Sequence, residues 1–128
     1  MSDGPRYQGF VPGRHLIDAY GNGGFRFADM SHRGSILALP SGVHAWAVRI
    51  PEDLTPEAFA PVVAEAGSIS VLLLGTGEGF ALVPDGVRSM LREAGISVDA
   101  MQTGAAARTY NVMAAENRPV AAALIAVD

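Results

Sequence analysis

The amino-acid sequence predicts an α/β fold with a central mixed sheet, and three observations lead to this prediction. Helix-like and strand-like segments alternate from residue 55 onward, as in sheets that are covered by helices. The run Val71–Leu74 is apolar without interruption and ends at Gly75, which is typical of a strand buried on both faces. Nearer the N-terminus, two strand-like segments flank the turn sequence Gly21-Asn22-Gly23, so a β-hairpin is expected to add an antiparallel part to the sheet.

The composition is that of one globular domain and limits the classes of function. The chain has 128 residues and a net charge of −4, whereas nucleic-acid binders need a basic face to neutralise phosphates. It has no cysteine, which excludes disulfides and thiolate metal sites. No stretch is long and apolar enough to cross a bilayer, and the N-terminus has no targeting pattern. We therefore expect a cytoplasmic protein that binds no nucleic acid and does not insert into a membrane.

The N-terminal part is expected to contain a tail and four strands. Residues 1–13 are broken by glycine and proline, so they should form a disordered or extended tail before a single α/β domain at 14–128. Phe25 and Phe27 lie two residues apart and so point to one face of a half-buried strand. The expected strands of this part are Leu16–Tyr20, Gly24–Ala28, Ser35–Leu39 and Ala45–Ile50.

The C-terminal part is expected to alternate three helices with strands. Thr55 is a candidate N-cap, Pro56 suits the first helical position and Gly67 suits a helix end. Thr103 is a candidate N-cap of an alanine-rich helix that can lie close to the sheet. The expected helices run from 55 to 67, from 84 to 95 and from 103 to about 115, with strands at Val71–Leu74, Ile96–Met101 and Val120–Val127, and with Phe80–Val83 extended.

The loop Gly75–Gly79 is the first candidate site, because it follows the buried strand directly. Its glycines resemble the start of a dinucleotide fingerprint, in which backbone N–H groups meet a pyrophosphate. However, Phe80 stands where a third glycine is needed, and the next helix begins only near Pro84. The pattern therefore favours an ordinary turn at a strand end over a nucleotide site, while the loop with Gly75, Thr76 and Gly77 can still form the wall of a pocket.

The helix that starts at Thr103 is the second candidate site. Arg108 and Asn111 lie on one helical face and could present donors together, with the N–H groups after Thr103, to a carboxylate or an oxyanion. The alternative is structural: Tyr110 packs in the core with a satisfied hydroxyl, and Arg108 pairs with Glu116 or a backbone carbonyl.

Two further groups of polar residues are candidates for a catalytic or metal-binding role. Glu116 and Arg118 flank the turn before the last strand, where they could come beside the Gly75 loop or only fix the turn. The three histidines show no metal-ligand spacing, and no carboxylates are spaced as an acid/base pair. The sequence thus predicts no metal, no cofactor and no catalytic residue, and it neither supports nor excludes an enzyme.

Several stretches resemble the family of small domains of unknown function that includes mitochondrial complex I assembly factor 3. The similarity is specific at residues 72–77, 95–101, 103–111 and 116–125, and weaker at Gly34–Pro40 and Trp46. The resemblance implies a three-layer β+α/β/α fold with a central mixed sheet. The positions that match the family's motif residues are Gly75, Thr76, Gly77, Thr103, Arg108, Tyr110, Asn111, Glu116 and Arg118. It implies no catalytic assignment for any of them.

The resemblance makes a non-enzymatic interaction or assembly factor the leading hypothesis, with a protein partner that could be a membrane-associated respiratory complex. The alternative is a small-molecule-binding or enzymatic domain that uses the Gly75–Gly79 loop and the Thr103 helix as its pocket. A third interpretation is a homo-oligomer whose exposed apolar surface binds a second copy.

Overall fold

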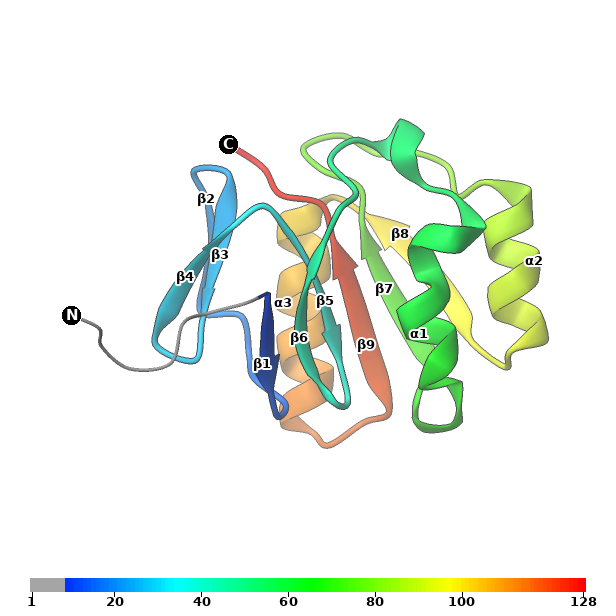
Figure 1. The fold of residues 1–128 in the computed structure, drawn as a ribbon, viewed down its shortest axis with the longest axis horizontal. Helices are drawn as coiled ribbons and strands as arrows, with labels where there is room; N and C mark the ends of the chain where they lie inside the picture. Colours follow the sequence, from blue (N-terminus) through cyan, green and yellow to red (C-terminus); the bar gives the residue numbers. More distant parts are fainter. Residues whose placement is uncertain (1–8) are drawn as a thin grey trace.

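The computed structural model describes residues 9–128, which form two sheets and three α-helices (Figure 1). The six-stranded mixed sheet has the strand order β1-β6-β5-β9-β7-β8, and the three-stranded antiparallel sheet has the order β2-β3-β4. The strands are β1 Phe10–Pro12, β2 Ala19–Gly21, β3 Gly24–Phe27, β4 Met30–Arg33, β5 Ser35–Leu39, β6 Gly42–Trp46, β7 Val71–Gly75, β8 Ser97–Met101 and β9 Val120–Leu124. The α-helices are α1 Ala60–Ala64, α2 Asp85–Glu93 and α3 Thr103–Ala115, with short 3-10 turns at Pro51–Asp53, Pro56–Phe59 and Ala66–Ser68.

The central sheet is parallel on one side and antiparallel on the other. Strand β7 runs parallel to both β8 and β9, whereas β5 pairs antiparallel with β9 and β6, and β1 closes the sheet antiparallel to β6. The register aligns Val71 with Val120 and Gly75 with Leu124. The segments that follow β7 and β9 therefore leave the sheet at the same end of these two strands.

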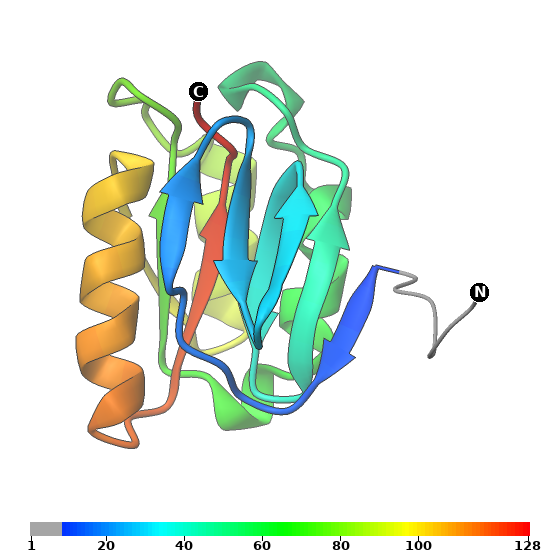
Figure 2. The same cartoon turned by 90° about the vertical axis from the view of Figure 1, so that its left-hand side faces the viewer.

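The core lies in two layers, one on each face of the central sheet. Successive residues of a strand point to opposite faces, so Leu72 and Leu74 pack toward α1 and α2, while Leu73 packs toward α3. Figure 2 shows α3 and the three-stranded sheet side by side on the second face. This arrangement confirms the predicted three-layer β+α/β/α fold with a central mixed sheet.

The predicted hairpin forms, but it does not join the central sheet. Its chain continues through a tight turn at Ala28 and Asp29, whose φ angles are 52° and 60°, into a third strand that the sequence did not indicate. The three strands make a separate sheet, and the antiparallel part of the central sheet comes from β5, β6 and β1. The prediction that the hairpin extends the central sheet is therefore wrong.

The first predicted helix is interrupted. A continuous helix from 55 to 67 would require Pro61 to donate a backbone hydrogen bond to the carbonyl of Glu57, and proline has no N–H. The chain instead forms a 3-10 turn, the short helix α1 and a second 3-10 turn. Thr55 does occupy the N-cap position of the first turn, with no hydrogen bond from its side chain.

Element ends differ from the prediction in three other places. Strand β6 covers Gly42–Trp46 and not Ala45–Ile50, because pairing with β1 begins at Gly42, where an added Cβ would lie 2.9 Å from the Cα of Pro12. The last strand stops at Leu124, and residues 80–83 are not in a strand. Residues 1–8 of the predicted tail lie outside the described residues, and Phe10–Pro12 form β1, so the division at residue 13 stays a prediction.

Candidate functional site

The first predicted site region is held together by the Thr103 side chain. The Thr103 hydroxyl donates to the carbonyl of Ile125 at 2.7 Å and accepts from the N–H of Gly77 at 3.0 Å. The Thr103 N–H in turn donates to the Gly77 carbonyl at 2.9 Å, and the Ile125 N–H donates to the Gly75 carbonyl at 3.0 Å. Because Thr103 is fully buried, this hydroxyl satisfies backbone groups that water cannot reach. We call Gly75, Gly77, Thr103 and Ile125 the Thr103 junction.

The junction leaves no room for a side chain at Gly75. A Cβ at this position would lie 2.9 Å from both the Cα and the Oγ1 of Thr103. Gly77 has a φ of +101°, a conformation that residues with a Cβ rarely adopt. The two glycines thus allow the end of β7 to approach the start of α3, and their placement does not need a ligand to explain it.

One sequence expectation about this region is corrected, and the contacts of Thr76 are defined. Gln102, and not Thr103, occupies the N-cap position of α3, because Thr103 already has helical geometry and its hydroxyl bonds to other segments. Thr76 is buried, and its hydroxyl donates to the carbonyls of Gly79 at 2.6 Å and Met101 at 3.2 Å. The polar side chains of the loop are therefore engaged with the chain's own backbone.

The polar residues of α3 hold the segment that leads into the three-stranded sheet. Asn111 forms two hydrogen bonds of 2.8 Å with the backbone N–H and carbonyl of Ile17. The Arg108 guanidinium donates to the Tyr20 hydroxyl at 3.0 Å. Arg108 and Asn111 thus bond to the same segment of the chain, at Tyr20 and at Ile17. The pairing of Arg108 with Glu116 or a carbonyl, expected in the structural alternative, is wrong.

Tyr110 packs in the core, as the structural alternative predicted. Its side chain is fully buried, and its hydroxyl donates to the carbonyl of His15 at 3.4 Å. Burial raises the pKa of the Tyr110 phenol above its usual 10.0, and the nearby Arg14 guanidinium partly opposes the shift. Tyr110 is thus a neutral structural group at physiological pH.

Glu116 and Arg118 do not lie beside the Gly75 loop. They occupy the turn between α3 and β9, which enters β9 at Val120, and the register places Val120 opposite the first residue of β7. The Gly75 loop leaves β7 at the opposite end of this strand. Glu116 and Arg118 therefore lie at one end of the strands β7 and β9, and the Gly75 loop lies at the other end. The two side chains form an exposed ion pair at 3.7 Å, which fits the simpler expectation that they only fix the turn.

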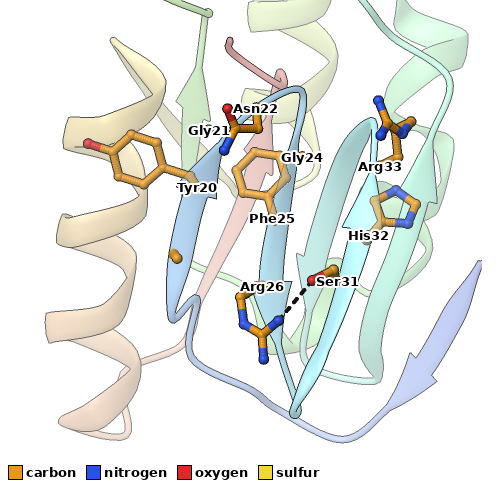
Figure 3. A pocket seen from close by; sticks show the side chains of 10 residues that line it. Tyr20, Gly21, Asn22, Gly24, Phe25, Arg26, Ser31, His32 and Arg33 are labelled. Atoms are coloured by element: carbon orange, nitrogen blue, oxygen red, sulfur yellow. Dashed lines mark hydrogen bonds between the residues drawn. The ribbon is translucent and has the colours of Figure 1, made fainter.

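A hollow of about 380 Å³ lies on the outer face of the three-stranded sheet (Figure 3). Its walls include Arg26 and Phe25 from β3 and His32 and Arg33 from β4, with Tyr20 at the side toward α3. The Arg26 guanidinium donates to the Ser31 hydroxyl at 3.0 Å. Arg26 and Arg33 make this face basic, whereas Phe25 is 3% exposed and belongs to the core. The two arginines lie on two different short strands, so no local motif indicates this face.

A second hollow of about 510 Å³ lies between the two sheets, where the three-stranded sheet meets β5 and β6. It is lined by Gly23, Arg33, Ser35, Trp46, Arg49 and Ala126, among others. Its residues come from four separate segments, so no local motif could have revealed it.

The histidines make local contacts, and two large apolar side chains are strongly exposed. Within residues 9–128, no three His, Cys, Asp or Glu side chains are grouped to hold a metal ion. His15 and His44 bond to Pro12 and Ser41 close by, as expected of histidines near turns. No α-helix in the described part of the chain has the length and apolar character needed to cross a membrane. The most exposed large apolar side chains are Phe80 and Leu82, at 67% and 80%.

Comparison with known proteins gives one family and several relatives. The model of a protein family of unknown function, DUF498/DUF598, matches residues 17–125. A Rhodobacter capsulatus protein without an assigned function is 39% identical over 121 residues, covering 94% of this chain and 91% of its own. A Bartonella henselae crystal structure, described as that of an outer membrane protein, is 54% identical with a TM-score of 0.88, and the match covers 91% of this chain and 98% of that one.

Other relatives are named as assembly factors. NADH dehydrogenase [ubiquinone] 1 alpha subcomplex assembly factor 3 of Mus musculus is 30% identical over 118 residues, which are 92% of this chain and 64% of the mouse protein. The chain thus spans about two thirds or less of the length of the mitochondrial relatives it matches. With a family model covering residues 17–125 and relatives that share its whole fold, this chain belongs to the DUF498/DUF598 family, which includes these assembly factors.

Proposed function

We propose that this protein is a non-enzymatic interaction factor that assists the assembly of a membrane-associated respiratory complex from the cytoplasmic side. The observation that carries the proposal is the 30% identity, over 92% of the chain, to a protein named as an NADH dehydrogenase assembly factor. The hydrogen bonds of the motif residues also support the proposal. Thr76, Thr103 and Asn111 bond to the chain's own backbone, so they maintain the fold and present no reactive group.

The segment between β7 and α2 is the surface that we assign to the partner. Phe80 and Leu82 are two residues apart on this segment, and their exposed fractions of 67% and 80% are the largest among the big apolar side chains of residues 9–128. Burying a side chain of this size in an interface contributes roughly 1.5–3 kcal/mol. The partner is therefore a subunit of the NADH dehydrogenase that offers an apolar surface.

The test is a crosslinked pull-down of the tagged full chain from the cells that make it, with membrane and cytosolic fractions analysed separately. We expect the wild type to enrich NADH dehydrogenase subunits from the membrane fraction and the Phe80→Ser/Leu82→Ser variant to lose them. Val112→Ser is the matched control, because Val112 is 59% exposed on α3, away from this segment. Recovery of no subunit, or equal recovery with the double variant, would contradict the proposal.

The alternative function, a small-molecule or enzymatic pocket at the Gly75–Gly79 loop and the Thr103 helix, stays a prediction. A ligand there would have to displace the hydrogen bonds of Thr76 and Thr103 to the backbone. Displacing such buried bonds costs about 1–3 kcal/mol for each group left unpaired. A ligand at this loop would therefore bind at the expense of the fold.

A further inference from the structure

The second hollow, between the two sheets, has unusual charge for this chain. Arg33 at the end of β4 and Arg49 beyond β6 both line it, and neither guanidinium has a hydrogen-bond or ion-pair partner within residues 9–128. Among the described residues that line the hollow, none is acidic. The whole chain carries a net charge of −4, so two unpaired cations at one hollow run against its overall acidic character.

Neither of the two acidic residues that follow Arg49 in the chain, Glu52 and Asp53, forms an ion pair with its guanidinium. The Asp53 carboxylate accepts hydrogen bonds from the backbone N–H groups of Arg49 at 2.9 Å and Ile50 at 3.3 Å. Asp53 thereby fixes the backbone that carries Arg49 and has no ion pair with the guanidinium. The Arg49 side chain remains available to an anion from outside.

The walls of the hollow are fixed by hydrogen bonds between segments far apart in sequence. The Gly34 N–H donates to the Gly23 carbonyl at 2.7 Å, and the Gly23 N–H donates to the Val127 carbonyl at 2.8 Å. The buried hydroxyl of Ser35 accepts from the N–H of Ala126 at 2.9 Å. A site whose walls are already ordered loses little entropy when a ligand binds.

The remaining lining is apolar in character. The Trp46 side chain is only 8% exposed: its ring packs against Phe59 with the centroids 5.5 Å apart, and its one polar atom, Nε1, donates to the Ala58 carbonyl at 2.8 Å, so a small part of its carbon surface reaches the hollow. Ala47 and Ala126 add methyl groups. A volume of about 510 Å³ lies within the usual range of about 300–1,000 Å³ for small-molecule sites.

We propose that this hollow binds a small organic anion with at least two negative charges, a phosphate ester or a polycarboxylate, held between the guanidinium groups of Arg33 and Arg49 with its apolar part against Trp46. Guanidinium groups present paired N–H donors that match the oxygens of phosphate and carboxylate. The site is separate from the Phe80 segment and does not depend on the assembly role.

The experiment is an NMR titration of the isotope-labelled full chain at constant ionic strength, with inorganic phosphate, phenyl phosphate and citrate as probes. We expect saturable shifts centred on Gly34, Ser35 and the Trp46 indole, with phenyl phosphate binding more tightly than phosphate because of its apolar ring. Arg33→Gln and Arg49→Gln should each weaken binding about tenfold or more, since each removes a charge-assisted hydrogen bond.

The matched control is Arg88→Gln on α2, whose guanidinium also has no hydrogen-bond or ion-pair partner among the described residues and does not line the hollow. It lowers the net charge by the same amount and should leave the affinity unchanged. The proposal is overturned if none of the three probes saturates, or if Arg88→Gln weakens binding as much as the two variants in the hollow. Tighter binding of citrate or of phenyl phosphate would identify the class of anion.

Discussion

Thr103 shows how one hydroxyl can fix three segments of a chain. It joins the loop after β7, the start of α3 and the chain that follows β9, all at one edge of the sheet. A threonine at a helix start is commonly an N-cap, and the sequence alone gave no reason to prefer the other role. The distinction depends on which backbone groups come within reach in the folded chain, and these are Gly77 and Ile125, 26 and 22 residues away.

Replacing Thr103 by valine should destabilise the fold strongly while preserving the side chain's shape. The change leaves the buried N–H of Gly77 and carbonyl of Ile125 without a partner, at an expected cost of about 2–4 kcal/mol. Urea unfolding followed by circular dichroism measures this difference. Thr109→Val is the control, because its hydroxyl contacts only the Met101 sulfur at 3.9 Å, and it should change stability by less than about 0.5 kcal/mol. Equal effects of the two substitutions would refute the role of the junction.

Tyr110 should make stability depend on pH in the alkaline range. Because burial raises its pKa above 10.0, the folded chain holds the phenol proton more tightly than the unfolded chain does. The resulting stabilisation is complete below about pH 10 and is lost as the pH rises through the pKa of the folded state. Wild type should therefore lose more stability between pH 8 and pH 11 than Tyr110→Phe, in parallel urea titrations. Parallel losses in both proteins would show that Tyr110 does not contribute.

At the scale of elements, the sequence predicts segments with strong periodicity well and short or interrupted ones poorly. The strand Ser35–Leu39 and the helix α3 were predicted correctly, because long apolar patterns identify them. The strand β4 was missed, since its turn uses Ala28 and Asp29 in a left-handed conformation that usually requires glycine or asparagine. Pro61 was overlooked as an interruption of the first helix.

The candidate site shows the same division between local and long-range information. The motif positions around Gly75 and Thr103 do come together, because parallel strands end at one edge of the sheet. Glu116 and Arg118 do not join them, since the turn that carries them precedes its strand. Arg33 and Arg49 line one hollow because the three-stranded sheet contacts the central sheet. The hydrophobic periodicity of a sequence gives no information about such a contact between sheets.

Asn111 supplies two hydrogen bonds to the attachment of the three-stranded sheet to α3, beside the apolar contacts of Phe25 and Phe27 with the same helix. Asn111→Ala removes both hydrogen bonds to the buried Ile17 backbone, whereas Arg108→Ala removes one exposed bond to Tyr20. We expect Asn111→Ala to speed amide hydrogen exchange at Ile17 and in β2–β4 about tenfold or more, because local opening becomes about 1–3 kcal/mol easier. Arg108→Ala should have a much smaller effect. Faster exchange in β7 and β9 as well would indicate global destabilisation instead.

For the whole molecule, the edge strands of the central sheet are where two copies could pair strand to strand. Strand β8 pairs only with β7, and its middle residue, Asp99, is exposed. If two copies paired symmetrically through β8, their Asp99 residues would face each other, and like charges directly opposite are unfavourable. The acidic residue thus protects this edge against self-association.

Asp99→Val should therefore promote dimer formation through β8. Analytical ultracentrifugation across a range of concentrations measures the expected increase in average mass. Glu93→Val, which adds an exposed apolar residue on α2 away from the edge, should leave the mass unchanged. An unchanged mass for Asp99→Val would show that another feature keeps the edges apart.

The place of β9 in the central sheet also has a consequence for the way this protein is made. β9 follows all the other strands of residues 9–128 in sequence, yet it lies between β5 and β7 and joins the antiparallel and parallel halves of the sheet. While the chain emerges from the ribosome, neither half can acquire its central neighbour until residues 120–124 have left the exit tunnel. The backbone edges of β5 and β7 that β9 later occupies stay unpaired until that moment, and such open strand edges favour association with other chains during synthesis.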